Sequence, residues 1–441
     1  MSAKRLDLFP ISADVNRHGQ LMLGGCNSAA LVRKYGSPLY VFDEATIRSQ
    51  CREYLHEFRT RYKDTTVAYA SKAFINKAVA HIIKEEGMGL DTVSGGEISV
   101  AQAVGFDPAE VFFHGNNKSE KELNMALDWG LGRIVVDNLH ELELLNRLAA
   151  GRRIKANILL RLNPSIDPHT HKHTTTGILD SKFGLPIGTG QAEEAVKKAL
   201  LLKNIALHGL HFHLGSPISE TGPYKQGLEV VLKFAAAMKS KHSFTMKEFS
   251  PGGGFAVRYI SSAEIPPVSS YAEAIVGNLM ALTLKFGLHK PRLIIEPGRS
   301  IIARSGVAIY TVGSIKDIPS VRTYVCVDGG MGDNIRPALY EAKYEALLAN
   351  KVNAENTRKI TIAGRYCESG DLLIKDIDMP EVTAGDLVAI PVCGAYCVPM
   401  SSNYNMVPHP PIVMVSAGRS RIIRRGQKYS DLMKYDVLGK S

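Results

Sequence analysis

Residues 66–97, TVAYASKAFINKAVAHIIKEEGMGLDTVSGGE, hold the pattern that decides the fold. The run at 66–70 is rich in β-branched and aromatic residues, which is typical of a buried strand. Apolar residues then recur at helical spacing through 75–86, and a second apolar run follows at 89–93. This order predicts a strand, a helix and a second strand, which is the repeating unit of α/β folds.

The same order recurs along the chain between residues 66 and 299. Eight short apolar runs are the expected strands, and each is followed by a small or polar turn. They lie at 66–70, 89–93, 111–114, 133–136, 158–162, 207–213, 248–250 and 292–295. Clear amphipathic segments, such as 193–202, separate several of them. Eight such units predict a TIM (β/α)8 barrel.

The pattern changes after residue 300, where strands joined by turns replace the alternation of strands and helices. The expected strands of this second region lie at 307–312, 322–327, 359–362, 387–391 and 412–416. Strand-like segments also occur at 20–23 and 38–42, ahead of the barrel. We therefore expect a barrel domain of residues 41–300. We expect residues 1–40 to join 301–441 in an antiparallel β domain, barrel-like or sandwich-like.

Length and composition exclude several classes of protein. The 441 residues are 45% apolar and 22% charged, which is the profile of a globular protein with two or three domains. The N-terminus MSAKRLDLFP has no apolar run behind its basic residues, and no stretch of about twenty uncharged apolar residues follows. We therefore expect a cytoplasmic protein that does not bind membranes.

The charged residues and cysteines indicate the kind of ligand. Lys and Arg number 53 against 43 Asp and Glu, a formal charge of +10, and they are scattered along the chain. The densest basic stretch, 419–425, is short and mixed with isoleucine, so an anionic small ligand is favoured over nucleic acid. The six cysteines form no CxxC pair. We therefore expect free thiols and no metal site.

In a TIM barrel the reactive side chains come from the carboxyl ends of the strands. Lys72 follows the first strand, where partial burial at the barrel mouth would free its amine as a nucleophile. Glu296 ends the eighth strand, and a buried carboxylate there needs a cationic partner, such as a protonated pyridine nitrogen. The glycines at 252–254, with Gly298 and Arg299, offer backbone N–H groups suited to a phosphate.

Each of these features also has an ordinary structural explanation. Lys72 taken alone is more often an exposed lysine at a strand end, and a glycine loop is often a tight turn without a ligand. His213 could stack on a heteroaromatic ring, although a hydrogen-bonded core histidine is commoner. Taken together, a lysine, a phosphate cradle and a carboxylate at one rim are the components of a pyridoxal phosphate site.

Several motifs carry a resemblance to a known family. Residues 69–72 (YASK), 213–216 (HLGS), 251–255 (PGGGF) and 296–300 (EPGRS) resemble the pyridoxal phosphate-dependent decarboxylases of the alanine-racemase fold. The match is in order and spans most of the chain. Further motifs are similar to those of the diaminopimelate decarboxylases within this family. They lie at 167–177, 181–184, 328–331, 336–340 (RPALY), 367–371 (CESGD) and 394–396.

The resemblance implies a role for each site residue. Lys72 carries pyridoxal 5'-phosphate, His213 stacks on its ring, and Glu296 keeps its pyridine nitrogen protonated. The other implied cofactor-binding residues are Asp91, Ser216, Gly253, Gly254, Pro297, Gly298, Arg299 and Tyr396. The implied substrate-binding residues are Arg299, Arg336, Tyr340, Glu368 and Tyr396. Cys367 is the implied proton donor, and it completes a catalytic set with Lys72, His213 and Glu296.

The activity implied is decarboxylation of meso-2,6-diaminopimelate to L-lysine and carbon dioxide, the last step of lysine biosynthesis. Arg336 and Glu368 fit this substrate because its non-reacting end needs a carboxylate clamp and an acceptor for an ammonium group. In the family, Cys367 and Glu368 reach the cofactor of the partner subunit, so a homodimer with two shared sites is implied.

Alternatives stay open at this point. A decarboxylase of ornithine, arginine or a D-amino acid would share every cofactor residue and differ only in the distal pocket. A non-catalytic protein that binds pyridoxal phosphate belongs to a different class, which the complete β domain with Cys367 disfavours. Phe74, Pro217 and Arg365 depart from the residues that are common at these positions in the family.

Overall fold

The computed structural model describes residues 6–167, 176–177 and 179–439, so most of the motif at 167–177 lies outside the described residues. The chain forms two compact units. The β unit comprises Met1–Ser49, Val257–Ala263 and Ile301–Ser441, and the barrel unit comprises Gln50–Ala256 and Glu264–Ser300. These limits differ from the predicted 41–300 because the strand at Leu39–Asp43 pairs within the β unit, and because Val257–Ala263 also packs there.

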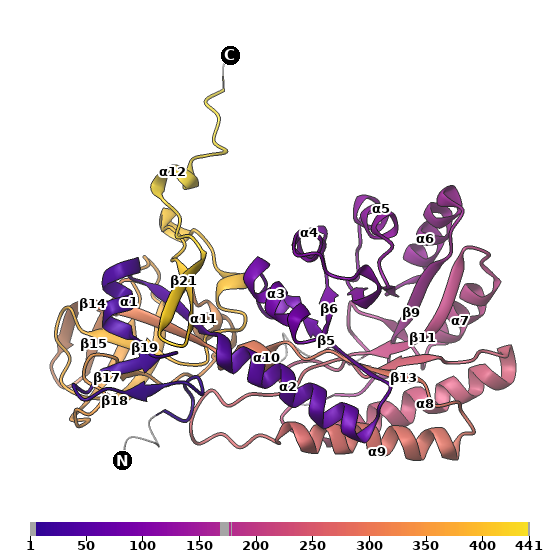
Figure 1. Cartoon of the computed structure of the whole chain (residues 1–441), viewed down its shortest axis with the longest axis horizontal. Coiled ribbons are helices and arrows are strands. Elements are labelled where there is room, and N and C mark those ends of the chain that lie inside the picture. Colours follow the sequence, from indigo (N-terminus) through magenta and orange to yellow (C-terminus); the bar gives the residue numbers. More distant parts are fainter. Residues whose placement is uncertain (1–5, 168–175, 178, 440–441) are drawn as a thin grey trace. The chain divides into compact units, whose positions relative to one another are not determined.

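The barrel unit is a closed sheet of eight parallel strands with helices on its outside (Figure 1). The strands are β5 (Thr65–Ala70), β6 (Gly89–Thr92), β7 (Val111–Phe113), β8 (Arg133–Val136), β9 (Ala156–Asn163), β11 (Ile205–Phe212), β12 (Glu248–Ser250) and β13 (Arg292–Ile295). They pair in chain order, and β13 pairs with β5 to close the ring. The short strand β10 (Leu185–Pro186) adds to β9. The predicted TIM barrel is confirmed.

Helices alternate with these strands, and those between β5 and β9 begin at side-chain caps. They are α2 (Glu44–Arg61), α3 (Lys77–Glu85), α4 (Gly95–Ala103), α5 (Glu120–Trp129), α6 (Leu139–Arg152), α7 (Gln191–Leu201), α8 (Gly222–His242), α9 (Val268–Lys285) and α10 (Arg299–Ile302). Asn76 and Asn138 accept hydrogen bonds of 2.9 Å from the backbone of the first turn of α3 and α6, and Ser94 caps α4. Such caps satisfy free N–H groups and keep the strand-to-helix turns short. Polar side chains of these turns therefore gather at one rim.

The β unit is built on a second sheet in the order β18-β17-β15-β14-β4-β20-β21, with β19 and β16 beside β14. Its strands are β4 (Leu39–Asp43), β14 (Gly306–Ile318), β15 (Arg322–Val327), β16 (Leu347–Leu348), β17 (Arg358–Ala363), β18 (Leu372–Met379), β19 (Leu387–Ile390), β20 (Ile412–Ser416) and β21 (Arg419–Arg424). A three-stranded sheet, β1 (Asp14–Val15), β2 (Leu21–Leu23) and β3 (Cys26–Asn27), precedes them. The sheet is mixed rather than antiparallel throughout, because β15 pairs with β17 and β20 with β4 in parallel.

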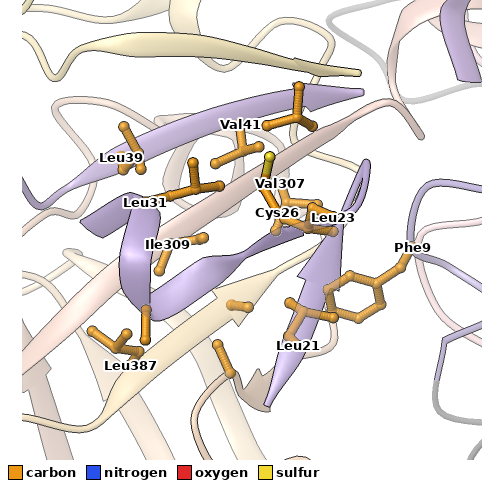
Figure 2. Packing of buried hydrophobic residues seen from close by; sticks show 14 of the residues in the cluster. Phe9, Leu21, Leu23, Cys26, Leu31, Leu39, Val41, Val307, Ile309 and Leu387 are labelled. Carbon is orange, nitrogen blue, oxygen red and sulfur yellow. The ribbon is translucent and has the colours of Figure 1, made fainter. Parts of the chain in front are cut away.

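One face of this sheet packs against the N-terminal segment. Figure 2 shows Leu31 of α1 (Ser28–Tyr35) among side chains of the strands, including Val41 of β4 and Ile309 of β14. These three side chains are at most 3% exposed. Burial of such a side chain contributes about 1.5–3 kcal/mol. Alternation along β4 turns Tyr40 to the other face, where its hydroxyl donates to Asp333.

Two short helices complete the β unit, α11 (Arg336–Tyr340) and α12 (Tyr429–Leu432). Within the described part of the chain, no helix is both long and apolar enough to cross a lipid bilayer.

Candidate active site

Lys72 stands at the carboxyl end of β5, in a 3-10 turn formed by Ser71–Ala73. The turn is fixed on both sides, because the Ser71 hydroxyl donates to the carbonyl of Asp91 at 2.6 Å and the Tyr69 hydroxyl donates to the carbonyl of Phe74 at 2.6 Å. The Lys72 side chain is exposed, whereas we expected partial burial. Its amine is therefore free to reach a ligand at the rim.

Glu296 follows β13 and is only 6% exposed. Ser250 at the end of β12 donates to its Oε1 at 2.7 Å, and the Nε2 of His211 on β11 lies 3.1 Å from its Oε2. Burial raises the pKa of this carboxyl, but the influence of His211 and the two hydrogen bonds lower it by more. The pKa therefore lies below its ordinary value, and the carboxylate is ionised in its buried site.

Asp91 ends β6 on the same rim and has the opposite behaviour. Burial, followed by the negative charge of Glu296, raises the pKa of Asp91 well above its ordinary value. The pKa values of these two neighbouring carboxyls are thus shifted in opposite directions. The shift favours the ionised form of Glu296 and the protonated form of Asp91. Burial, followed by the charge of Lys72, also lowers the pKa of His213 well below its ordinary value. The His213 ring is therefore neutral near pH 7.

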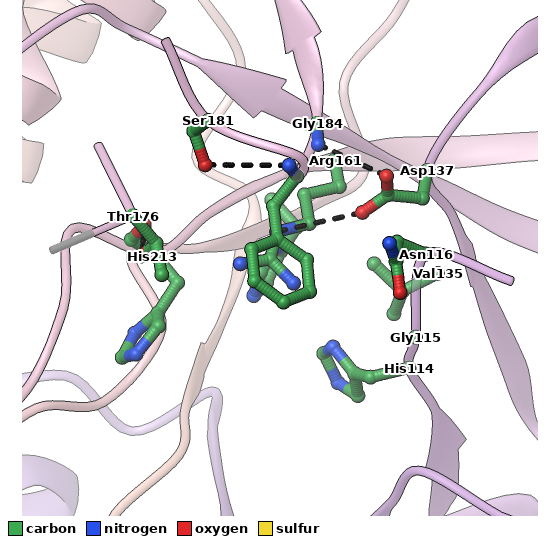
Figure 3. Close-up of polar contacts among 12 residues, drawn as sticks. His114, Gly115, Asn116, Val135, Asp137, Arg161, Thr176, Ser181, Gly184 and His213 are labelled. Carbon is green, nitrogen blue, oxygen red and sulfur yellow. Dashed lines mark hydrogen bonds and ion pairs between the residues drawn. The ribbon is translucent and has the colours of Figure 1, made fainter. Parts of the chain in front are cut away.

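Arg161 of β9 brings a further buried cation to the rim. Its Nε lies 3.8 Å from Oδ1 of Asp137, whose Oδ2 accepts from the backbone of Gly184 at 3.0 Å (Figure 3). The guanidinium lies 4.5 Å from the ring centroid of Phe183. The sequence analysis did not single out Arg161, although a charged residue inside the apolar run at 158–162 is a signal for it.

The glycine loops come close to one another at this rim. Gly254 has a φ of +105°, which L side chains rarely adopt, and a Cβ on Gly298 would lie 2.9 Å from the Cβ and carbonyl oxygen of Ala70. Next to them, the Nε of the buried Arg299 donates to the hydroxyl of Ser216 at 3.3 Å. Small residues, backbone N–H groups and a guanidinium form the surroundings that a phosphate requires.

Two histidines that the sequence analysis left out of the site lie beside Glu296. The Nε2 of His114 is 3.7 Å from both Glu296 and Asp91, and its ring meets that of His211 edge-on at 5.0 Å. One ring nitrogen each of His114 and His211 and one carboxylate oxygen of Glu296 all lie within 4.8 Å of one another. His211 lies on β11, two residues before His213, which directly follows this strand. Strand alternation is therefore the signal that could have placed His211 in the barrel interior.

Three buried polar atoms at this rim have no hydrogen-bond partner among the described residues, namely Asp91 Oδ1, His114 Nε2 and His211 Nδ1. Buried polar atoms are nearly always paired, so a polar group from outside the chain fits beside them. The rim thus combines an accessible lysine, an ionised buried carboxylate and a glycine-lined cradle. These residues fit pyridoxal phosphate, which needs an amine for its aldehyde, an anion for its ring nitrogen and donors for its phosphate.

In the β unit, the predicted substrate-binding residue Arg336 begins α11 and is 6% exposed. Its guanidinium lies 4.4 Å from the ring centroid of Tyr259 and donates to the hydroxyl of Tyr344. The two tyrosine rings meet edge-on at 5.4 Å, and Tyr344 also contacts the Sγ of Cys397 at 3.6 Å. No carboxylate of the described residues forms an ion pair with Arg336. This buried cation therefore suits an anionic ligand.

Cys367 and Glu368 lie in the turn between β17 and β18, and both side chains are exposed. The turn is held by Asp371, whose carboxylate accepts from the backbone of Tyr366 at 2.8 Å and of Met331 at 2.6 Å. Within one chain, the described contacts join Cys367 to the Asn405 side chain and the Tyr404 hydroxyl, and not to the residues around Arg336.

Tyr340 is the last residue of α11, and Tyr396 directly precedes Cys397. The hydroxyl of Tyr340 lies 4.0 Å from the Sδ of Met400, and Tyr396 has a φ of +61° next to Cys397. Tyr259 and Tyr344, which contact Arg336, were missed because an isolated tyrosine carries no signal of its partner.

Comparison with known proteins agrees with this geometry. A family model described as the pyridoxal-binding domain of pyridoxal-dependent decarboxylases matches residues 44–303. The diaminopimelate decarboxylase of Bacillus subtilis is 44% identical over 422 residues and covers 96% of each chain. That of Halalkalibacterium halodurans is 42% identical and covers 97% of this chain and 98% of its own. The crystal structure of the M. jannaschii enzyme with L-lysine has a TM-score of 0.92 at 32% identity, covering 97% and 98%.

The barrel and the residues at its rim define a pyridoxal phosphate-dependent decarboxylase, a carboxy-lyase. Full-length identity at this level narrows the assignment further. The chain belongs to the diaminopimelate decarboxylase family.

Proposed function

We propose that this protein converts meso-2,6-diaminopimelate to L-lysine and carbon dioxide, the last step of lysine biosynthesis, with pyridoxal 5'-phosphate as cofactor. The observation that carries the choice of substrate is Arg336, a buried guanidinium that forms no ion pair with a carboxylate of the described residues. A substrate with an amino acid centre at each end has a distal carboxylate to place there. The M. jannaschii relative was solved in complex with L-lysine.

The barrel residues bind and polarise the cofactor in this proposal. When bound, pyridoxal phosphate supplies an electron sink for the charge left on the substrate carbon as carbon dioxide departs. Lys72 would hold the cofactor through its amine, and the neutral ring of His213 would stack on the cofactor ring. Ionised Glu296 would keep a proton on the ring nitrogen. Asp91 and Pro297, at the strand ends, would contact the cofactor.

The phosphate is held by groups whose surroundings favour an anion. Gly253, Gly254 and Gly298 offer backbone N–H groups, and Ser216 and Tyr396 offer hydroxyls. Arg299 carries the matching positive charge and also reaches the substrate. Fixing the phosphate in this way orients the ring relative to Lys72 and Glu296.

The β unit selects the substrate. Arg336, with Tyr340 and Tyr396, binds the distal carboxylate, and Glu368 accepts from the distal ammonium. Cys367 returns a proton to the carbon that has lost carbon dioxide. We propose that Cys367 and Glu368 act in the site of a second copy of the chain, which agrees with their exposed side chains.

Product analysis tests the function directly. The purified protein is incubated with pyridoxal phosphate and meso-diaminopimelate, and carbon dioxide and lysine are measured. Parallel reactions contain ornithine, arginine and D-lysine. Equimolar lysine and carbon dioxide from diaminopimelate alone is the expected result. Release of carbon dioxide from ornithine or arginine, with none from diaminopimelate, would favour the simpler basic amino acid decarboxylase.

Subunit mixing tests the shared site. Lys72→Ala and Cys367→Ala proteins are each expected to be inactive or nearly so. After subunit exchange, half of the dimers are mixed, and each mixed dimer has one intact site. About one quarter of the wild-type activity should therefore return. No recovery after exchange is confirmed would refute the homodimer with shared sites. The cytoplasmic location stays a prediction.

A further inference from the structure

We propose that His211 is a positioning residue that fixes the Glu296 carboxylate for the ring nitrogen of the cofactor, with Ser250 as its counterpart on the other oxygen. The inference deepens the proposed function, because it rests on the role of Glu296 in that function. It concerns a residue that the family motifs quoted above do not include.

The placement follows from the strand register. His211 on β11 pairs with Ser250 on β12, and Glu296 follows β13, the next strand of the barrel. The Nε2 of His211 lies 3.1 Å from Oε2 of Glu296, while the hydroxyl of Ser250 donates to Oε1 at 2.7 Å. Each carboxylate oxygen thus has its own donor from a different strand. Two donors fix the plane of the carboxylate, which a single one would leave free to rotate.

Burial makes these donors necessary. His211 is 1% exposed and Glu296 is 6% exposed, so water does not solvate the carboxylate. An ionised carboxylate can only accept hydrogen bonds, so the proton of the His211 ring must sit on Nε2. Without this donor, the desolvation penalty would favour the protonated form of Glu296, which has no negative charge to keep a proton on the pyridine nitrogen.

His114 constrains the His211 ring in turn. The two rings meet edge-on at 5.0 Å, and His114 lies between the carboxyls of Glu296 and Asp91 with 3.7 Å to each. Burial lowers the pKa of His114 well below its ordinary value, so this ring is neutral near pH 7. His114 thus lies between the two carboxyls, and its proximity adds to that of His211 in lowering the pKa of Glu296.

The experiment compares two substitutions of His211. The His211→Gln side chain can still donate a hydrogen bond toward Glu296, whereas His211→Leu keeps the apolar volume but has no donor. The matched control is His208→Leu on the same strand, where the ring contacts Asn157 and not the site. Affinity of each apoprotein for pyridoxal phosphate, the absorption spectrum of the bound cofactor, kcat and KM are measured.

His211→Leu should shift the absorption band of the bound cofactor and lower kcat on the order of ten- to hundredfold, with cofactor affinity within a few fold and KM within about twofold of the wild type. His211→Gln should recover most of each loss, and His208→Leu should match the wild type. A folded His211→Leu protein in which the spectrum of the bound cofactor is unchanged would overturn the proposal. Equal defects in the Gln and Leu variants would do the same, because they would indicate a packing role.

Introducing the substitutions into a Glu296→Gln protein distinguishes the proposed role of Glu296 from the positioning role of His211. If Glu296→Gln alone leaves spectrum and kcat unchanged, the proposed role of Glu296 fails. If Glu296→Gln is defective and His211→Leu adds little to it, the two residues act together as proposed. If the losses of kcat caused by Glu296→Gln and His211→Leu were fully additive, the positioning role of His211 would be refuted and the role of Glu296 would stand. Should His211→Leu fail to fold, Ser250→Ala removes the other donor, and an unchanged spectrum there would refute the paired-donor arrangement.

Discussion

Replacing Arg336 by methionine separates substrate recognition from stability. The guanidinium is buried, lies 4.4 Å from the Tyr259 ring centroid and donates to Tyr344. Methionine keeps an apolar side chain against these rings and removes a buried charge, so the melting temperature should stay equal or rise. Loss of the charge-assisted hydrogen bonds from the guanidinium to the distal carboxylate should weaken transition-state binding by about 2–4 kcal/mol. This corresponds to about a 30- to 900-fold fall in kcat/KM for diaminopimelate.

The assay measures kcat/KM for meso-diaminopimelate and for lysine, which lacks the second carboxylate, together with thermal unfolding. Lysine should be a very poor substrate of the wild type, and Arg336→Met should narrow the gap between the two substrates. The matched control is Arg322→Met in the same unit, where the arginine pairs with Asp376 at 2.8 Å. Equal losses on both substrates with a lowered melting temperature would show that Arg336 supports the fold, and the reasoning would be refuted.

Three further outcomes are expected. Lys72→Ala should retain no covalently bound cofactor after borohydride reduction, and retention at the wild-type level by mass spectrometry would contradict its role. Glu296→Gln should keep most cofactor binding and lose about two or more decades of kcat, measured by stopped assays of lysine formation. Burial raises the pKa of the Asp333 carboxyl to about 7, although hydrogen bonds from Tyr310 and Gly330 oppose this rise. The protonated Asp333 therefore contributes to the stability of the folded protein below about pH 4, and this contribution is lost as the pH rises through about 7. Asp333→Asn should remove this fall of up to a few kcal/mol from the free energy of unfolding between pH 4 and 7, and an identical pH profile in both proteins would contradict it.

The barrel could be predicted because most of its strands are short, mainly apolar runs that are buried on both faces. All eight predicted runs correspond to strands of the barrel. The β unit was harder to predict, since β18 and β21 mix charged with apolar residues without regular alternation and give only a weak strand signal. The two parallel pairings of its sheet depend on contacts between distant segments, which periodicity does not encode.

The site was predictable where chemistry coincides with strand ends, as for Lys72, and less so where one side chain supports another. His211 and Ser250 are recognised only when the register of β11 and β12 places both beside Glu296. Tyr259 presents a similar difficulty, because it follows the glycine loop of the barrel in sequence but packs in the β unit against Arg336.

Strand β4 sets the order in which the chain can be assembled during synthesis. Val41 pairs with Val307 on one side and with Val413 on the other, so this early strand has both neighbours encoded late in the chain. The barrel unit is complete once residue 300 has left the ribosome, whereas Leu39 and Val41 must wait for residues 306–318 and 412–416. The N-terminal apolar segment therefore stays without its sheet for most of translation, when exposed strand edges invite aggregation. A chain that stops before residue 412 would leave one edge of β4 permanently unpaired, and ribosome-associated chaperones would be expected to retain it.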